Sequence, residues 1–195
     1  MMRPTREQAW EILTEYTKSE ALLQHALAVE AVMRHFAELA GEDRDPWGVI
    51  GLLHDLDYEQ YPQEHCHKTA EILTEKGVNA QYIRAIGSHG YGICTDIEPQ
   101  SALEKTLYTI DELTGLINAV CLMRPSKSVL DLEVKSVRKK FKQPSFAAGV
   151  NRAVITKGCA MMGMDLADVI AETILGMRNV AAAIGLQGDL SEVEK

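Results

Sequence analysis

The dipeptide His54-Asp55 follows an apolar run, residues 49–53, that has the composition of a buried helix. An imidazole and a carboxylate in apolar surroundings need partners, because an isolated polar or ionised group is costly to bury. A metal ion would be such a partner. The pair therefore indicates a metal site, provided that further ligands fall on neighbouring elements.

Two further residues with suitable chemistry fall on the apolar faces of other predicted helices. His25 lies on the inward face of a predicted helix over residues 19–40, and Asp111 lies at the edge of the apolar stripe of another over residues 101–123. A single histidine on such a face is also typical of a core residue. Taken together, three helices would direct ligands at one locus: His25, His54, Asp55 and Asp111. Two imidazoles and two carboxylates suit a divalent ion such as Mn²⁺, Fe²⁺, Co²⁺, Ni²⁺ or Zn²⁺, with positions left for water.

Nearly every segment has a helical period, and no run alternates with the period of a strand. Thr5 with Gln8 forms a capping-box pattern for a first helix that ends near Tyr16, and Asp45-Pro46 is typical of a helix start before His54. We predict one all-α domain over residues 1–195. Helices are expected over residues 5–16, 19–40, 45–55, 62–77, 79–89, 101–123, 125–144, 146–159 and 165–186.

Composition limits the classes of partner. The chain has 195 residues, of which 46% are hydrophobic and 25% charged, and its formal net charge is −8. A negative molecule repels nucleic acid and anionic membranes, so we expect neither as a partner. The first residues, MMRPTREQAW, lack the apolar segment of a signal peptide, which favours the cytoplasm.

The four cysteines are far apart in the sequence and contain no C-x-x-C pair. We therefore expect small buried or inert thiols rather than a zinc–thiolate site or a disulfide framework. The residues concerned are Cys66, Cys94, Cys121 and Cys159.

The order His25, His54-Asp55, Asp111 resembles the H…HD…D signature of the HD-domain superfamily of metal-dependent phosphohydrolases. The segment GLLHDLDYEQYPQEHCHKTAEIL is similar to the pattern in which a further histidine, here His65, follows the HD pair by about ten residues and opens a helix. IRAIGSHG resembles the next element, which ends in a histidine, here His89. The resemblance covers about residues 20–120 and implies a helical bundle of the HD type, with additional C-terminal helices over about 125–187.

Carried over position by position, the resemblance implies that His25, His54, Asp55 and Asp111 bind one divalent metal ion, Mg²⁺ included. In superfamily members with two metals, Asp55 would bridge to a second ion bound by His65 and His89. Many two-metal members have adjacent histidines where this chain reads Ser88-His89, which leaves the second site open. Two other histidines are interpreted as a surface residue, His67, and a structural residue, His35.

The resemblance implies a phosphohydrolase that cleaves a nucleotide or another small phosphorylated metabolite with a metal-activated water. Residues expected to be catalytic are His54, Asp55, His65 and His89; the last two would either bind the second ion or contact the phosphate and move protons. One alternative is a di-iron oxygenase of the HD type. Another is a non-catalytic HD module that senses a nucleotide.

Two residues outside the metal set are candidate substrate contacts, Lys127 and Tyr91. A predicted basic helix within residues 125–144 also carries cations at helical spacing: Lys135, Arg138, Lys139 and Lys142. We interpret this second group as the solvated face of an amphipathic helix. The substrate, the metal and the oligomeric state stay open at the level of sequence.

Overall fold

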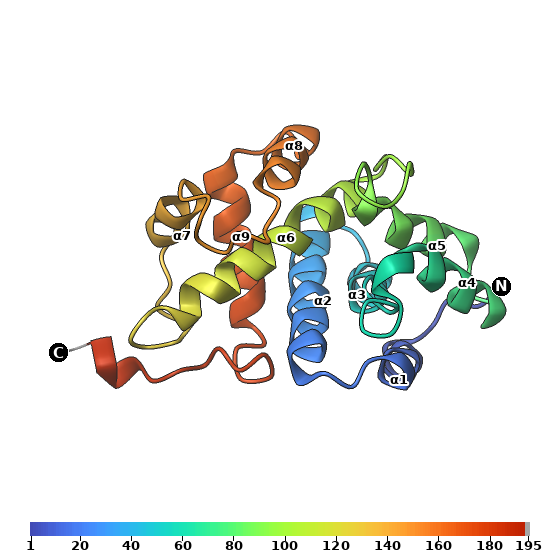
Figure 1. Cartoon of the computed structure of the whole chain (residues 1–195), viewed down its shortest axis with the longest axis horizontal. Helices are drawn as coiled ribbons and strands as arrows, with labels where there is room; N and C mark the ends of the chain where they lie inside the picture. The colour runs from blue at the N-terminus through green and yellow to red at the C-terminus, as the bar shows by residue number, and fades with distance from the viewer. Residues whose placement is uncertain (194–195) are drawn as a thin grey trace.

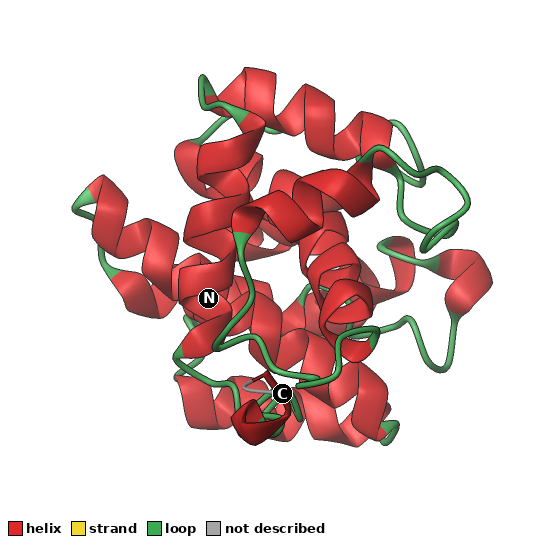
Figure 2. Cartoon of the chain, turned by 90° about the vertical axis from the view of Figure 1, so that its left-hand side faces the viewer, coloured by secondary structure: helices red, strands yellow, loops and turns green. Residues whose placement is uncertain are grey.

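The computed structural model describes residues 1–193. Within them the chain forms nine α-helices and three short 3₁₀ helices and no strand, which confirms the all-α prediction (Figures 1 and 2). The bounds are α1 Arg6–Tyr16, α2 Glu20–Ala40, α3 Arg44–Leu53, η1 Pro62–Glu64, α4 His67–Glu75, α5 Ala80–Gly87, η2 Ser88–Gly90, α6 Ala102–Leu122, α7 Val134–Phe141, α8 Arg152–Met162, α9 Leu166–Arg178 and η3 Leu190–Val193. None of the described helices combines the length and the apolar character needed to cross a membrane.

The two longest helices, α2 and α6, have 21 residues each and form the frame of the molecule. They cross near its middle, with α1, α3, α4 and α5 on one side and α7, α8 and α9 on the other (Figure 1). Helix α2 packs against α3, α6 and α9. The start of α6 is fixed by a capping box, in which Ser101 accepts the Glu104 N–H and the Glu104 side chain accepts the Ser101 N–H.

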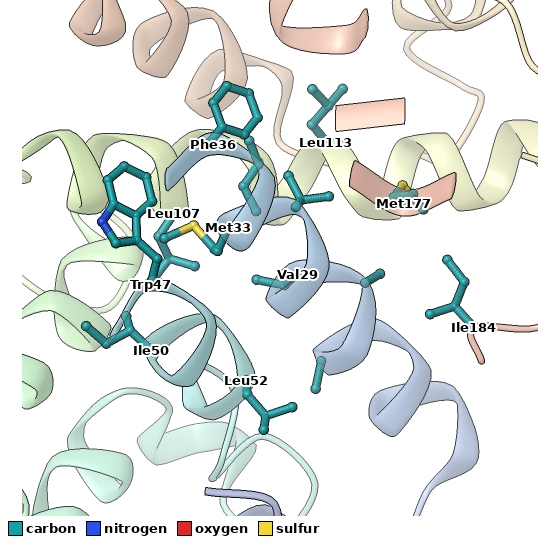
Figure 3. Close-up of a cluster of buried hydrophobic side chains, with 14 of the residues drawn as sticks. Val29, Met33, Phe36, Trp47, Ile50, Leu52, Leu107, Leu113, Met177 and Ile184 are labelled. Atoms are coloured by element: carbon teal, nitrogen blue, oxygen red, sulfur yellow. The ribbon is translucent and has the colours of Figure 1, made fainter. Parts of the chain in front are cut away.

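The core lies where α2, α3, α6 and α9 meet (Figure 3). Apolar side chains spaced three and four residues apart on each helix turn towards this space, as amphipathic helices require. The labelled core residues of Figure 3 include Val29, Met33, Trp47, Leu52, Leu107, Leu113 and Met177. This packing fixes α2, α3 and α6 relative to one another. These helices, with the turn that follows α3, carry the four predicted ligands of the first metal site.

Several predicted boundaries differ from the structure. Helix α3 begins at Arg44, because the Asp43 side chain accepts the Asp45 N–H, and it ends at Leu53. The helix predicted over residues 62–77 is broken at Cys66, whose φ of 67° does not fit a right-handed helix. In place of a helix over 125–144, only Val134–Phe141 is helical.

Helices α6 and α8 approach each other closely at Gly158. A Cβ atom at this position would overlap the Thr109 hydroxyl and lie 2.8 Å from the Thr109 Cβ. Gly158→Ala is therefore expected to lower the free energy of unfolding by about 1–3 kcal/mol, as overpacked sites do. Gly115→Ala, within α6, is the matched control: its Cβ would meet nothing within 4 Å, and the gain in helix propensity should stabilise the protein by up to about 1 kcal/mol. Urea unfolding of both variants checks this, and equal stabilities would contradict the close packing.

Candidate metal centre

The four predicted ligands of the first site come together. His25 projects from α2 and Asp111 from α6, while His54 is the C-terminal cap of α3 and Asp55 begins the turn that follows. His54 is fully buried, and its Nδ1–H donates to the Gly51 carbonyl at 2.8 Å. This bond fixes the tautomer in which the lone pair of Nε2 is free, as in histidines that ligate metals.

The four ligand atoms have the spacing that a metal ion requires. His25 Nε2 lies 3.0 Å from Asp111 Oδ1 and 3.2 Å from His54 Nε2. Asp55 Oδ2 lies 3.4 Å from His54 Nε2 and 3.7 Å from His25 Nε2. Ligands about 2.1 Å from an ion are separated by about 3.0 Å in octahedral and about 3.4 Å in tetrahedral geometry. These residues therefore fit one divalent ion.

A second cluster lies beside the first. His65 follows η1, His89 lies in η2, and their Nε2 atoms are 3.1 Å apart. The His89 Nδ1–H donates to the Ile86 carbonyl at 2.6 Å, and the His65 Nδ1–H donates to Asp57 Oδ1 at 2.8 Å. Both Nε2 atoms are thus left to accept a metal.

Asp55 connects the two clusters through its two oxygens. Oδ2 faces His25 and His54, whereas Oδ1 lies 3.6 Å from His65 Nε2 and 3.5 Å from His89 Nε2. A carboxylate shared in this way is the arrangement expected of a bridging ligand between two ions about 3.5–4 Å apart. The structure thus places all six predicted ligand residues at one centre.

Sequence reasoning missed Asp57. Its side chain is fully buried; Oδ1 accepts the His65 Nδ1–H, and Oδ2 accepts the Thr69 N–H at 2.8 Å. This carboxylate orients His65 and joins it to the first turn of α4. The available signal was a second acidic residue two positions after Asp55 in a segment with apolar neighbours, since a buried carboxylate needs partners.

The metal-free centre holds a proton where a metal would bind. Burial alone would lower the pKa of His54, but the carboxylates of Asp55 and Asp111 raise it well above its usual value. Burial would raise the pKa of Asp111, but His54 and His25 lower it well below its usual range. In the absence of metal these shifts favour ionised carboxylates on Asp55 and Asp111 and a proton on His54 Nε2, so a metal must displace that proton.

Metal affinity of the first site is consequently expected to rise with pH. Below the raised pKa of His54, each displaced proton should change the dissociation constant by about tenfold per pH unit. Competition of Zn²⁺ with a chelator between about pH 6 and 8 measures this. Calorimetry in buffers of different ionisation enthalpy should report proton release, and an affinity independent of pH without such release would contradict the expectation.

Two cysteines that are far apart in the sequence lie together in the structure. Cys66 Sγ lies 3.1 Å from Cys94 Sγ and 3.8 Å from His89 Nε2. The turn at residues 90–95, in which the Ile93, Cys94 and Thr95 N–H groups donate to the Gly90 carbonyl, brings Cys94 back to Cys66. Cys121, by contrast, is a buried core thiol, and burial raises its pKa to about 12.

The other singled-out histidines have the positions expected of non-ligands. His67 is exposed at the start of α4. His35 Nε2 pairs with Glu172 Oε2 of α9 at 2.7 Å, which is a structural contact. Ser88, the residue before His89, is fully buried. Its hydroxyl donates to the Ala85 carbonyl at 2.7 Å, so the side chain points towards α5.

The two candidate substrate contacts lie in different places. Tyr91 is two residues from His89, and its half-buried ring lies under the Lys157 Nζ of α8 at 4.2 Å. Lys157 was not singled out from the sequence, where nothing distinguishes it from other lysines. Lys127 lies in the turn after α6. Along the helix axis, the C-terminal end of α6 is about 16 Å from Asp111. The structure does not bring Lys127 to the metal residues.

The basic residues of α7 also lie away from the centre. Val134, Val137 and Phe141 face inward, and the cations Lys135, Arg138, Lys139 and Lys142 are exposed. In Figure 1, α7 and α4 lie at opposite ends of the molecule. This arrangement supports the interpretation of a solvated face.

The centre is open to solvent on one side. The side chains of Asp55 and Asp111 are 19% and 21% exposed, whereas that of His54 is 0% exposed. A cavity beside His25, between α2, α6 and the segment after α9, measures about 70 Å³. The exposed ring of Tyr58 stands edge-on to His65, with ring centroids 5.3 Å apart.

A family model described as the HD domain matches residues 22–116. This chain contains an HD domain. The match includes all six predicted ligand residues, from His25 to Asp111, and leaves α7, α8 and α9 outside. HD domains are generally metal-dependent hydrolases. Searches among curated proteins and among solved structures found no match.

Proposed function

We propose that this protein is a metal-dependent phosphohydrolase that cleaves a phosphate ester of a nucleotide or another small phosphorylated metabolite. The observation that supports this most directly is Asp55, whose two oxygens serve two ligand clusters in the HD domain. Two adjacent ions suit phosphoryl transfer, because attacking and leaving oxygens can both be stabilised. The open side of the centre gives a substrate access to them.

A bound divalent ion supplies an activated water at neutral pH and neutralises charge on a phosphoryl oxygen. The protein's own groups determine where this happens. His25, His54 and Asp111 hold the first ion, and the buried Nδ1–H bond of His54 keeps its ring in place. Asp55 holds both positions at a fixed separation, so that the reacting groups are oriented before reaction.

His65 and His89 have two possible roles in the proposed reaction. With two ions bound, they are ligands of the second ion. With one ion bound, their free Nε2 atoms lie at the centre, where they contact the phosphate and transfer protons. Tyr91, with Lys157 above its ring, is a proposed contact at the margin of the site.

The proposed substrate is small and soluble. A formal net charge of −8 disfavours nucleic acid and anionic membrane surfaces. We therefore expect one phosphorylated molecule at a time rather than a polymer.

A screen of phosphorylated metabolites tests the proposal. The purified protein is supplied with Mn²⁺, Co²⁺ or Ni²⁺, phosphate release is measured, and the metal-depleted protein and an Asp55→Asn variant are run beside it. Metal-dependent release that is lost in Asp55→Asn is expected. Phosphate release that persists without metal, or that is as fast in the Asp55→Asn variant as in the unaltered protein, would contradict the proposal.

The complete second cluster also favours a second candidate, a di-iron oxygenase of the HD type, because that chemistry requires two occupied sites. Iron-loaded protein that consumes oxygen in the presence of a small organic substrate, and releases no phosphate from the screen, would decide for the oxygenase. Tight nucleotide binding without turnover in either assay would instead decide for a sensing module.

A further inference from the structure

We propose that Cys66 supplies a thiolate ligand to the second metal site. The inference rests on the two-ion form of the proposed function, whose second site would then be a mixed nitrogen, sulfur and oxygen site. Thiolate ligands select borderline or soft ions such as Zn²⁺, Fe²⁺ and Co²⁺, whereas Mg²⁺ prefers oxygen ligands alone. The second site would therefore differ in metal preference from the first, whose ligands are nitrogen and oxygen.

The geometry of the ligand atoms supports sulfur ligation. Cys66 Sγ, His65 Nε2 and His89 Nε2 all lie within 4.8 Å of one another, and the Cys66 Sγ to His89 Nε2 distance is 3.8 Å. With metal–sulfur and metal–nitrogen bonds of about 2.3 and 2.1 Å, tetrahedral geometry separates sulfur and nitrogen by about 3.6 Å. Asp55 Oδ1 lies 3.6 Å from His65 Nε2 and 3.5 Å from His89 Nε2 and would add a carboxylate donor.

The backbone at Cys66 explains how two consecutive residues face one ion. In extended chain, neighbouring side chains point to opposite sides. Cys66 has φ 67° and ψ −40°, a tight turn that a residue with a side chain rarely adopts. The turn aims the side chains of His65 and Cys66 at the same locus, and such local strain is typical of functional positions. Cys66 is only 2% exposed.

The surroundings of Cys66 leave space for its sulfur. A Cβ atom at Gly90 would lie 2.8 Å from Cys66 Sγ and overlap Cys94 Sγ. Glycine next to His89 thus makes room for two sulfur atoms behind the metal position. Cys94 Sγ lies 3.1 Å from Cys66 Sγ and does not belong to the ligand group itself.

Spectroscopy of the Co²⁺-loaded protein tests the inference without measuring activity. Metal-free, reduced protein is loaded with Co²⁺ to saturation of both sites, and a thiolate-to-Co²⁺ charge-transfer band is expected in the near ultraviolet. Cys66→Ser should abolish the band. Loss of an outer-shell partner alone weakens metal binding by ~10–100-fold, so the second site should weaken at least tenfold or so in this variant.

Cys159→Ser removes a buried thiol of α8 and is the matched control, which should keep the band, as should Cys94→Ser. Circular dichroism and Co²⁺ binding at the sulfur-free first site report whether each variant is folded. A saturated wild-type protein without the band, a band retained in Cys66→Ser, or a band lost only in Cys94→Ser would overturn the inference.

X-ray absorption of the Zn²⁺-loaded wild-type protein gives a readout that needs no variant. One sulfur atom at about 2.3 Å from zinc is expected, and a shell of nitrogen and oxygen alone would overturn the assignment. The outcome is separate from that of the proposed function. A sulfur-ligated ion in a protein that releases no phosphate would overturn the hydrolase, whereas hydrolysis without a sulfur ligand would overturn only the role of Cys66.

Discussion

Asp55→Asn protein is expected to lose both metal ions and to lose hydrolytic activity by at least roughly 10³-fold, since removal of even one electrostatic contact at a reacting centre costs ~10²–10³-fold. The amide keeps the shape of the side chain but has only one oxygen. It therefore cannot present an oxygen to each of the two clusters, as Asp55 Oδ2 and Oδ1 do. Metal content after dialysis and phosphate release with saturating metal measure the two effects.

Asp168→Asn, an exposed substitution in the first turn of α9, is the matched control and should retain metal and activity. The expected pattern requires loss of metal and loss of hydrolysis to occur together in Asp55→Asn. A variant that binds two ions as tightly as the wild type would contradict the bridging role. A variant that stays active after metal depletion would contradict metal-dependent hydrolysis itself.

Asp57→Asn is expected to weaken metal binding at the second site by ~10–100-fold while leaving the first site intact. This is the range observed when a residue that hydrogen-bonds to a metal-binding histidine is replaced. Asp57 accepts two N–H groups, from His65 and from Thr69. The amide of asparagine can accept only one of them. When the NH₂ of the asparagine faces His65, the His65 ring takes its other tautomer. His65 Nε2 then carries a proton where a lone pair is needed to bind the metal.

Calorimetric titration with Zn²⁺ separates the two sites in the Asp57→Asn variant. Because Asp57 is fully buried, the unpaired donor should also lower the free energy of unfolding by about 1–3 kcal/mol. Unfolding in urea measures that loss, and Asp168→Asn again serves as the control. Equal weakening of both sites would indicate general disruption, and an unchanged second site would contradict the positioning role of Asp57.

Much of the fold could be predicted from short-range signals in the chain. The capping boxes of Thr5 and Ser101 and the left-handed stop at Gly41 depend only on residues within one helical turn, and the structure has them. The failures were also local. The helix expected through Cys66 is broken by one unusual φ, and the basic helix is shorter than the spacing of prolines suggested.

The sequence by itself determined which residues have metal-binding chemistry and that they lie on separate helices, because residue type and helical period are properties of the chain. Only the tertiary structure decided that Asp55 faces two clusters, that Asp57 holds His65, that Cys66 and Cys94 meet, and that Lys127 is far from the metal residues. These relations join residues from different elements. Their distances follow from how α2, α3 and α6 pack and where the turns between them run, which no local pattern of residues specifies.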